Sequence, residues 1–383
     1  MSLIEKTQAA FRTHFPRTED AIRLFRAPGR VNVIGEHTDY NDGFVLPVAI
    51  NFDTVVAATP RDDRMVHVVA VDERQEDEFD LEQPITPHPS QTWSNYVRGM
   101  AKILSEADQT LSGVNLAIAG EVPRSGGLSS SASLEMALGH MFLRLSGLDV
   151  DGVKLALWGQ KTENTFVGVN CGIMDQFISS LGQQDHALLI DCRDLSYESV
   201  QIPSGTAIIV VDSGIQRGLV DSEYNNRRAE CETAAAHFGV TALRDLDLET
   251  LEAGKSDLDP VVYKRARHVV TEDARTMAAV KALSKGDLTA LGPLMAHSHV
   301  SMRDDFEITV SGIDTLVEIM QGVEGIYGAR MTGGGFGGCC IALAPQHVVP
   351  AVVEAIESRY QVETGYEPTI YQCQAAAGAG EIT

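Results

Sequence analysis

A glycine- and serine-rich run combines the features of an anion-binding loop. It reads Ser125-Gly126-Gly127-Leu128-Ser129-Ser130-Ser131 and precedes an apolar segment with helical spacing at 134–147. Its glycines let the backbone approach a ligand closely, and the start of the following helix offers unpaired N–H groups at the positive end of the dipole. An ordinary helix cap needs one serine, so the run favours a site for a di- or triphosphate. The lysine of the common G-x-x-x-x-G-K-[ST] loop is absent.

The segment GRVNVIGEHTDY, residues 29–40, concentrates hydrogen-bonding side chains. Arg30, Glu36, His37, Thr38 and Asp39 lie within it. Carboxylates accept several hydrogen bonds and an imidazole donates or accepts one, which suits a polyhydroxylated substrate whose hydroxyls need partners once they leave water. Two alternatives stay open. One is a metal site at Glu36, His37 and Asp39, although no second histidine lies at zinc-type spacing; the other is a solvated polar loop.

A second glycine-rich segment lies near the end of the chain. It reads TGGGFGG, residues 332–338, and follows Arg330. Five glycines in six positions indicate that the backbone approaches a ligand or another loop. The segment precedes an apolar run that predicts a strand, CCIALA, whereas a dinucleotide-binding motif would precede a helix. The pattern therefore argues against a dinucleotide fold.

Three further candidates are weaker on their own. Asp175, in CGIMDQF, falls in the first turn of a predicted helix, where acidic residues are common because of the helix dipole. Glu163 is, by itself, an ordinary surface carboxylate of the preceding predicted helix. His297 and His299 are two residues apart on a predicted helix and must point to different faces, so they do not form a metal-binding pair.

Hydrophobic periodicity predicts a mixed α+β chain. We expect strands at 22–26, 53–60, 65–71, 186–191 and 206–212, with a polar stretch between the first two that is either a long loop or a ligand site. Helices are expected after the serine-rich run, at 152–167, from 173 to 181, and over most of 220–325. The composition changes from strand-like to helix-like near 190–205, which predicts domains at 1–195 and 196–383.

Composition limits the classes of function. The 383 residues are 44% hydrophobic and 22% charged, as in globular proteins, and the net charge is −23. This charge disfavours nucleic acid and anionic lipid as partners. No apolar run is long enough to span a membrane, and no signal peptide is visible. Six cysteines without C-x-x-C spacing predict reduced thiols and a cytoplasmic protein.

Taken together, these segments resemble the galactokinase family of the GHMP small-molecule kinase superfamily. GRVNVIGEHTDY is similar to the galactokinase signature at every defined position. PRSGGLSSSAS resembles the phosphate motif of the superfamily and MTGGGFGG its third motif. The order and separation of the motifs agree, and the resemblance extends over essentially the whole chain. One departure is Ser125, which stands where a glycine is common; we expect it to affect nucleotide affinity rather than activity.

The resemblance implies a fold, a reaction and a set of site residues. The fold would be α+β, with two domains of mixed sheets and helices and an active site in the cleft between them. The reaction would transfer the γ-phosphate of ATP to the C1 hydroxyl of α-D-galactose, the first committed step of galactose metabolism (the Leloir pathway), in a monomer. Residues Ser125 to Ser131 would bind ATP, Ser131 and Glu163 would hold Mg²⁺, Arg30 and Asp175 would be catalytic, and the sugar would contact Glu36, His37, Thr38, Asp39, Gly172 and Tyr224.

Two rival hypotheses remain at this point. The chain could be a kinase of the same superfamily that acts on mevalonate, homoserine or N-acetylgalactosamine; the carboxylates at 36 and 39 favour a sugar over the first two. It could also be a sensor that binds sugar and ATP without catalysis. Such a sensor could dispense with Arg30, Asp175 or the loop serines, all of which are present.

Overall fold

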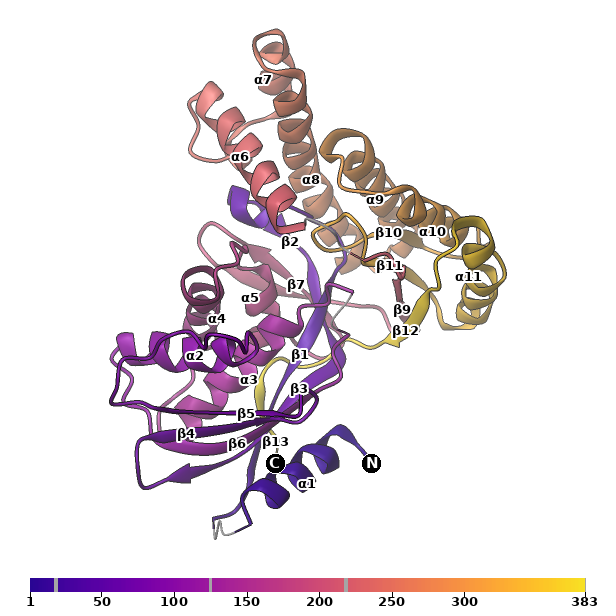
Figure 1. Ribbon diagram of the computed structural model, residues 1–383. Coiled ribbons are helices and arrows are strands. Elements are labelled where there is room, and N and C mark those ends of the chain that lie inside the picture. Colours follow the sequence, from indigo (N-terminus) through magenta and orange to yellow (C-terminus); the bar gives the residue numbers. More distant parts are fainter. Residues whose placement is uncertain (17–19, 124–125, 217–219, 383) are drawn as a thin grey trace.

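A six-stranded sheet with helices on both faces forms the N-terminal half of the molecule (Figure 1). The computed structural model describes residues 1–16, 20–123, 126–216 and 220–382, without the side chains of 220–222. The strand order is β13-β1-β3-β6-β4-β5, and all neighbours are antiparallel except β4 and β6. The strands are β1 (Arg23–Asn32), β3 (Pro47–Arg61), β4 (Met65–Ala70), β5 (Gln75–Asp80), β6 (Gly113–Gly120) and β13 (Gly380–Ile382).

Alternating side chains decide which helices cover each face of this sheet. In β3, Val56 and Ala58 pack in one core cluster with Met100 and Phe142 of the helices on that face. Ala57, between them, packs on the opposite face against Phe11. The first face carries α2 (Ser94–Glu106), α3 (Ser130–Leu145), α4 (Gly152–Thr162) and α5 (Met174–Leu181), and the second carries α1 (Leu3–His14).

A four-stranded antiparallel sheet organises the C-terminal half, in the order β10-β11-β9-β12. In β9, Ile209 and Val211 pack in one cluster with residues of the surrounding helices. Ile208 and Val210 pack in another, which also contains Val31 of β1. This second cluster joins the two halves of the chain. The elements are β9 (Thr206–Asp212), β10 (Gly328–Met331), β11 (Cys339–Pro345), β12 (Thr369–Cys373), α6 (Val220–Phe238), α7 (Leu248–Ala253), α8 (Pro260–Ser284), α9 (Leu288–Ser301), α10 (Ser311–Gln321) and α11 (Val349–Thr364).

The remaining elements are a small third sheet and several short helical segments. A three-stranded sheet contains β2 (Phe44–Val45), β7 (His186–Asp191) and β8 (Tyr197–Gln201). The π-helical segments Glu163–Val167 and Met302–Phe306 extend α4 and α9, and the short 3-10 segments are Asp39–Asn41, Leu243–Asp245, Lys255–Asp257 and Gln346–Val348. At the end of the chain, Ile382 of β13 pairs with Leu24 of β1. The last strand of the predicted second domain therefore belongs to the first sheet, and a division at 195 stays a prediction.

Several of the expected elements are confirmed, and others differ for physical reasons. The strands at 186–191 and 206–212 coincide with β7 and β9. A loop over the whole stretch between the first two expected strands is wrong, because β1 continues to Asn32 and β3 already begins at Pro47. The expected helix at 152–167 is α-helical to Thr162 and then widens into a π-helix. No disulfide joins the cysteines of the described residues, in agreement with the predicted reduced thiols.

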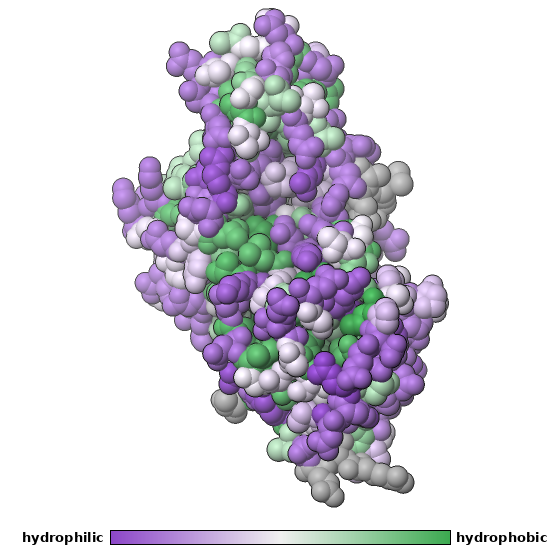
Figure 2. Space-filling view, turned by 90° about the vertical axis from the view of Figure 1, so that its left-hand side faces the viewer, coloured by the Kyte–Doolittle hydropathy of each residue, from purple (hydrophilic) through white to green (hydrophobic). Residues whose placement is uncertain are grey.

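The molecular surface agrees with the acidic composition. Figure 2 shows the face toward α4 and α6, where hydrophilic side chains predominate around a hydrophobic area near the middle. A net charge of −23 requires such a surface. Each helix that the structure describes is too short or too polar to cross a bilayer.

Candidate active site

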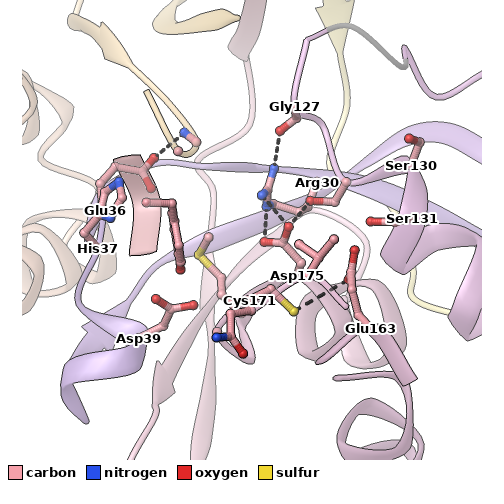
Figure 3. Close-up of a pocket in the computed structure, with 18 of the residues that line it drawn as sticks. Arg30, Glu36, His37, Asp39, Gly127, Ser130, Ser131, Glu163, Cys171 and Asp175 are labelled. Carbon is pink, nitrogen blue, oxygen red and sulfur yellow. Dashed lines mark hydrogen bonds and ion pairs between the residues drawn. The ribbon is translucent and has the colours of Figure 1, made fainter. Parts of the chain in front are cut away.

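A cavity of about 310 Å³ lies where the two halves of the chain meet. Most of the residues singled out by the sequence line it (Figure 3). They come from the end of β1, the turn after it, the loop before α3, the first residue of a π-helix, the start of α5, helix α6 and the second glycine-rich segment. The lining includes Arg30, Glu36, His37, Asp39, Gly127, Ser129, Ser130, Ser131, Glu163, 168–172, Met174, Asp175, Tyr224, Asn225, Gly333 and Gly334.

Arg30 and Asp175 form a two-point ion pair in this cavity. The ladder between β1 and β3 shifts register at Gly29, directly before Arg30. From there the guanidinium donates to both carboxylate oxygens of Asp175, at 2.7 and 2.6 Å, and to the carbonyl of Gly127 at 2.7 Å. The hydroxyl of Ser129 also donates to Asp175. Asp175 lies in the first turn of α5, as expected, but its side chain serves this pair as well as the helix dipole.

The loop before α3 does not form an ordinary helix cap. Ser129 is the N-cap residue, yet its backbone is left-handed, with φ 62° and ψ 48°, and its side chain makes no capping hydrogen bond. The cap therefore leaves the first-turn N–H groups of α3 available to a ligand. The same N-terminus carries the positive end of the helix dipole. This geometry supports the anion-site interpretation over the structural one.

Contacts with both halves of the chain hold the loop in place. The carbonyl of Leu128 accepts a hydrogen bond from the Arg30 backbone N–H at 3.0 Å, and the Leu128 side chain is fully buried. A Cβ added at Gly126 would lie 2.6 Å from the sulfur of Cys339 in β11, so only glycine fits there. Leu128 and Gly126 thus support the loop rather than line the cavity. The predicted ATP contact at Ser125 lies outside the described residues.

Glu163 is a buried carboxylate at the edge of the cavity, and not the surface group that its position alone suggested. Its exposed fraction is 6%. Burial, and then the charge of Asp175, raises its pKa to about 7, even though hydrogen bonds from Ser131, Cys171 and Gln176 act in the opposite direction. All these neighbours are neutral or acidic, so the carboxylate has the surroundings of a cation ligand. The described residues contain no group of three or more His, Cys, Asp or Glu side chains that could hold a metal ion without other ligands.

Glu36 lies on the opposite side of the cavity (Figure 3). Its exposed fraction is 2%, so the alternative of a solvated polar loop is wrong. One carboxylate oxygen accepts hydrogen bonds from the Thr332 hydroxyl at 3.1 Å and from the Gly333 N–H at 2.8 Å. The second glycine-rich segment therefore supports this acidic residue.

Aromatic rings surround His37 and keep it neutral. The imidazole contacts the rings of Tyr40, Tyr224 and Phe306, with centroid distances of 5.7, 5.2 and 4.8 Å. Its Nδ1 lies 2.8 Å from the Tyr40 hydroxyl. Burial lowers the pKa of His37 to about 3. A neutral ring can donate or accept one hydrogen bond, as a hydroxylated ligand requires.

Asp39 and Gly172 are in direct contact. A Cβ added at Gly172 would lie 1.7 Å from Oδ2 of Asp39, so no other residue fits at 172 without displacing the carboxylate. Burial, and then the charge of Asp175, raises the pKa of Asp39 to about 6. The side chain of Thr38, which lies between His37 and Asp39 in the sequence, does not line the cavity. Its hydroxyl lies 2.9 and 2.7 Å from the carbonyls of Gly35 and Phe44 and closes the turn, so the predicted sugar contact of this side chain has no support in the geometry.

Comparison with known proteins assigns the family. A model of the galactokinase galactose-binding signature matches residues 9–60, and the GHMP kinase N-terminal and C-terminal domain models match 95–183 and 279–362. A crystal structure of Lactococcus lactis galactokinase complexed with galactose is 38% identical, covers 100% of both chains and has a TM-score of 0.94. The chain belongs to the galactokinase family of GHMP kinases. It is an ATP-dependent sugar kinase with the α+β fold of that family.

More distant matches share only the fold with this galactokinase. A Methanococcus jannaschii mevalonate kinase is 15% identical, with coverage of 94% and 100% of the two chains and a TM-score of 0.66. A D-glycero-D-manno-heptose 1-phosphate kinase from Bacteriodes thetaiotaomicron is 12% identical, with coverage of 95% and 99% and a TM-score of 0.64.

The galactokinase has a second cavity that the sequence analysis did not identify. It has a volume of about 260 Å³ and shares Ser130 and Ser131 with the first cavity. Trp93 and Tyr96, at the start of α2, lie in its wall, together with Asp72 and Glu73. The two aromatic residues stand three apart in TWSNY, but core packing produces the same pattern. Only the fold shows that they lie beside the N-terminus of α3.

Proposed function

We propose that this galactokinase transfers the γ-phosphate of ATP to the C1 hydroxyl of α-D-galactose, giving galactose 1-phosphate and ADP. The observation that carries the proposal is the position of the Arg30–Asp175 pair. It lies between the carboxylates at 36 and 39 on one side and the N-terminus of α3 on the other. A sugar on the first side and a phosphate on the second would meet at this pair.

The sugar side of the cavity supplies acceptors for hydroxyl groups. Glu36 and Asp39 accept hydrogen bonds when ionised, neutral His37 offers one more polar group, and Tyr224 packs beside that imidazole. Gly172 has no side chain, so the carboxylate of Asp39 can occupy the space beside it. We assign these five residues to the sugar, and exclude the side chain of Thr38 from the assignment.

Asp175 acts on the hydroxyl that attacks the phosphate. It accepts the proton of the C1 hydroxyl, while Arg30 fixes its orientation and stabilises charge on the phosphoryl group. Arg30 and Ser129 both donate to the Asp175 carboxylate and hold it in one orientation. A loose phosphoryl-transfer transition state needs little deprotonation of the nucleophile, so orientation and electrostatics supply most of the rate.

ATP would occupy both cavities. Its phosphates bind Gly127 and the backbone donors at Ser129 to Ser131, and its base enters the second cavity and stacks on Trp93. Ser131 and Glu163 fit a Mg²⁺ ion, because a buried carboxylate without a cation beside it faces the phosphate site. Mg²⁺ usually combines one or two carboxylates with substrate phosphates. When bound, it neutralises phosphate charge.

We propose a cytoplasmic monomer for this kinase. The described residues contain no disulfide, as expected for a protein of a reducing compartment. One chain supplies every residue assigned to the sugar, the phosphates and the metal ion. Light scattering on the purified protein tests the oligomeric state, and a dimer at the enzyme's working concentration would overturn this part of the proposal.

Substrate tests separate the candidate reactions. Purified protein is incubated with Mg·ATP and, separately, D-galactose, D-glucose, N-acetylgalactosamine or mevalonate, and ADP release is followed. Phosphorus NMR identifies the product. We expect ADP release with galactose and a phosphate at the anomeric position. Saturable galactose binding without turnover would instead support the sensor hypothesis. A Trp93→Ala variant should raise KM for ATP and leave KM for galactose unchanged; the reverse pattern would move the base out of the second cavity.

A further inference from the structure

Arg330 is a fully buried arginine to which the proposed reaction gives no role. Its side chain has an exposed fraction of 0% and lies in β10, beside β11. One terminal nitrogen lies 3.2 Å from Oε1 of Glu36, and the other donates to the carbonyl of Asn32 at 3.3 Å. Among the described residues, its Nε has no hydrogen-bond partner. A buried ion pair is often no more stabilising than apolar packing of similar volume, so fold stability alone does not account for this group.

The donors around Glu36 are distributed unequally between its two oxygens. Oε1 accepts a hydrogen bond from the Gly333 N–H at 2.8 Å and forms the ion pair with Arg330 at 3.2 Å. The Thr332 hydroxyl lies 3.1 Å from Oε1 and 3.0 Å from the carbonyl of Asn32, and its one proton can serve either acceptor. No described residue donates to Oε2, and Glu36 lines the cavity. These contacts, all on one oxygen, fix the rotation of the carboxylate, which leaves Oε2 as the acceptor available to a ligand.

We propose that Arg330 is a positioning residue for the sugar, which acts through Glu36. The guanidinium compensates the buried negative charge of Glu36, and with Thr332 and Gly333 it directs Oε2 to one sugar hydroxyl. Thr332 and Gly333, the first residues of the glycine-rich segment at 332–338, thereby serve the acceptor sugar. The inference rests on the proposed assignment of Glu36 to the sugar.

Surrounding charges make this compensation necessary. The backbone N–H of Glu36 lies 3.3 Å from a carboxylate oxygen of Glu272, which is itself buried. The Glu36 charge also acts on Asp39, on the same side of the cavity. On the other side, Arg275 donates to Glu272 rather than to Glu36. Arg330 is thus the cation that the described residues place against the Glu36 carboxylate.

The first part of the test compares arginine variants by calorimetry. Arg330→Gln keeps a donor and removes the charge; we expect galactose to bind about 10- to 150-fold more weakly, the range for one hydrogen bond to a charged group. ATP affinity should stay within about twofold of the wild-type value, as for a site that is not disturbed. Arg265→Gln is the matched control, because Arg265 is also buried and pairs with Glu230 and Glu307, which do not line the cavity.

The second part uses the 2-, 3-, 4- and 6-deoxygalactoses as probes of single hydroxyls. In the wild type, each missing hydroxyl costs affinity. In Glu36→Gln and in Arg330→Gln, we expect this loss of affinity to become smaller for one deoxygalactose, and for the same one in both variants. Thr332→Val removes one donor without removing a charge and should give the same pattern more weakly. It also serves as the test if Arg330→Gln does not fold.

Each result decides between distinct conclusions. Unchanged galactose binding in Glu36→Gln would overturn the assignment of Glu36 to the sugar. A second result would overturn the role of Arg330 alone. In it, Glu36→Gln weakens galactose binding as expected, but the affinity lost with each deoxygalactose is the same in Arg330→Gln and Thr332→Val as in the control Arg265→Gln. Equal weakening of ATP and galactose in Arg330→Gln would also overturn this role, since it would reveal a general structural defect.

Discussion

Replacing Gly172 by alanine should selectively impair galactose binding. The added Cβ would lie 1.7 Å from Oδ2 and 2.2 Å from Cγ of Asp39, whereas ordinary contact begins at 3.4 Å. The backbone at 172 does not require glycine, because its φ is outside the positive range. The clash is therefore the only direct effect of the substitution, and the carboxylate must leave its present position.

The size of the effect follows from what Asp39 contributes. A hydrogen bond from a ligand to a charged group contributes roughly 1.5–3 kcal/mol. At about 1.4 kcal/mol per tenfold change in affinity, the loss of one such bond weakens galactose binding by about 10- to 150-fold. ATP affinity should change by less than about twofold, because the nucleotide site does not involve Asp39.

Calorimetric titration of galactose into four proteins measures this coupling: the wild type, Gly172→Ala, Asp39→Ala and the double variant. If alanine acts only by displacing the carboxylate, it has almost no effect once Asp39 is already gone. Gly380→Ala is the control, because a Cβ there meets nothing within 4 Å and φ is not positive. Wild-type affinity in Gly172→Ala, or an equal loss in both backgrounds, would refute the reasoning.

Three further predictions concern the chemistry of the same cavity. Asp175→Asn and Arg30→Ala should each lower kcat by about 100-fold or more, with a smaller effect on galactose affinity, and near wild-type turnover would contradict their roles. Glu163→Gln should raise the Mg²⁺ concentration needed for half-maximal turnover and leave galactose binding unchanged in calorimetry; an unchanged Mg²⁺ requirement would remove it as a ligand. The pKa of Asp39 is raised to about 6, so the carboxylate accepts hydrogen bonds above that pH and is protonated below it. Galactose affinity should therefore fall as pH decreases through 6, and this step should be absent in Asp39→Asn.

Strong local patterns were sufficient to predict part of the fold. β7 and β9 coincide with their expected ranges, because both are rich in apolar residues that are buried in the core. β8 was missed because four of its five residues are exposed, and it forms only by pairing with β7. β1 continues through polar residues to Asn32 because its ladder with β3 extends that far. Such pairing is a property of the tertiary structure and leaves no local pattern.

The residue types of the site were visible in the sequence, but their partners were not. Arg30 and Asp175 are 145 positions apart, and Glu36 and Gly333 are 297 apart. Nothing local distinguishes Asp175 from an acidic residue that serves a helix dipole. The resemblance also extended the sugar contacts to Thr38, whereas the local turn engages its hydroxyl. Arg330 was noted only as a flanking residue, because its role depends on the packing of β10 against the end of β1.

Charge balance in the cavity explains why its carboxylates need Arg30, the helix dipole of α3 and the proposed cation. Glu36, Asp39, Glu163 and Asp175 line the cavity, and Arg30 is the only arginine or lysine among its described lining residues. Burial raises the pKa values of Asp39 and Glu163, and the negative charge of Asp175 raises both further. ATP brings further negative charge into a protein whose net charge is already −23. The helix dipole of α3 offsets part of it. Arg30 is already paired with Asp175, so we propose that the divalent cation assigned to Glu163 offsets much of the remainder. Sugar binding depends less on that ion, because Arg330 compensates Glu36 from behind the cavity.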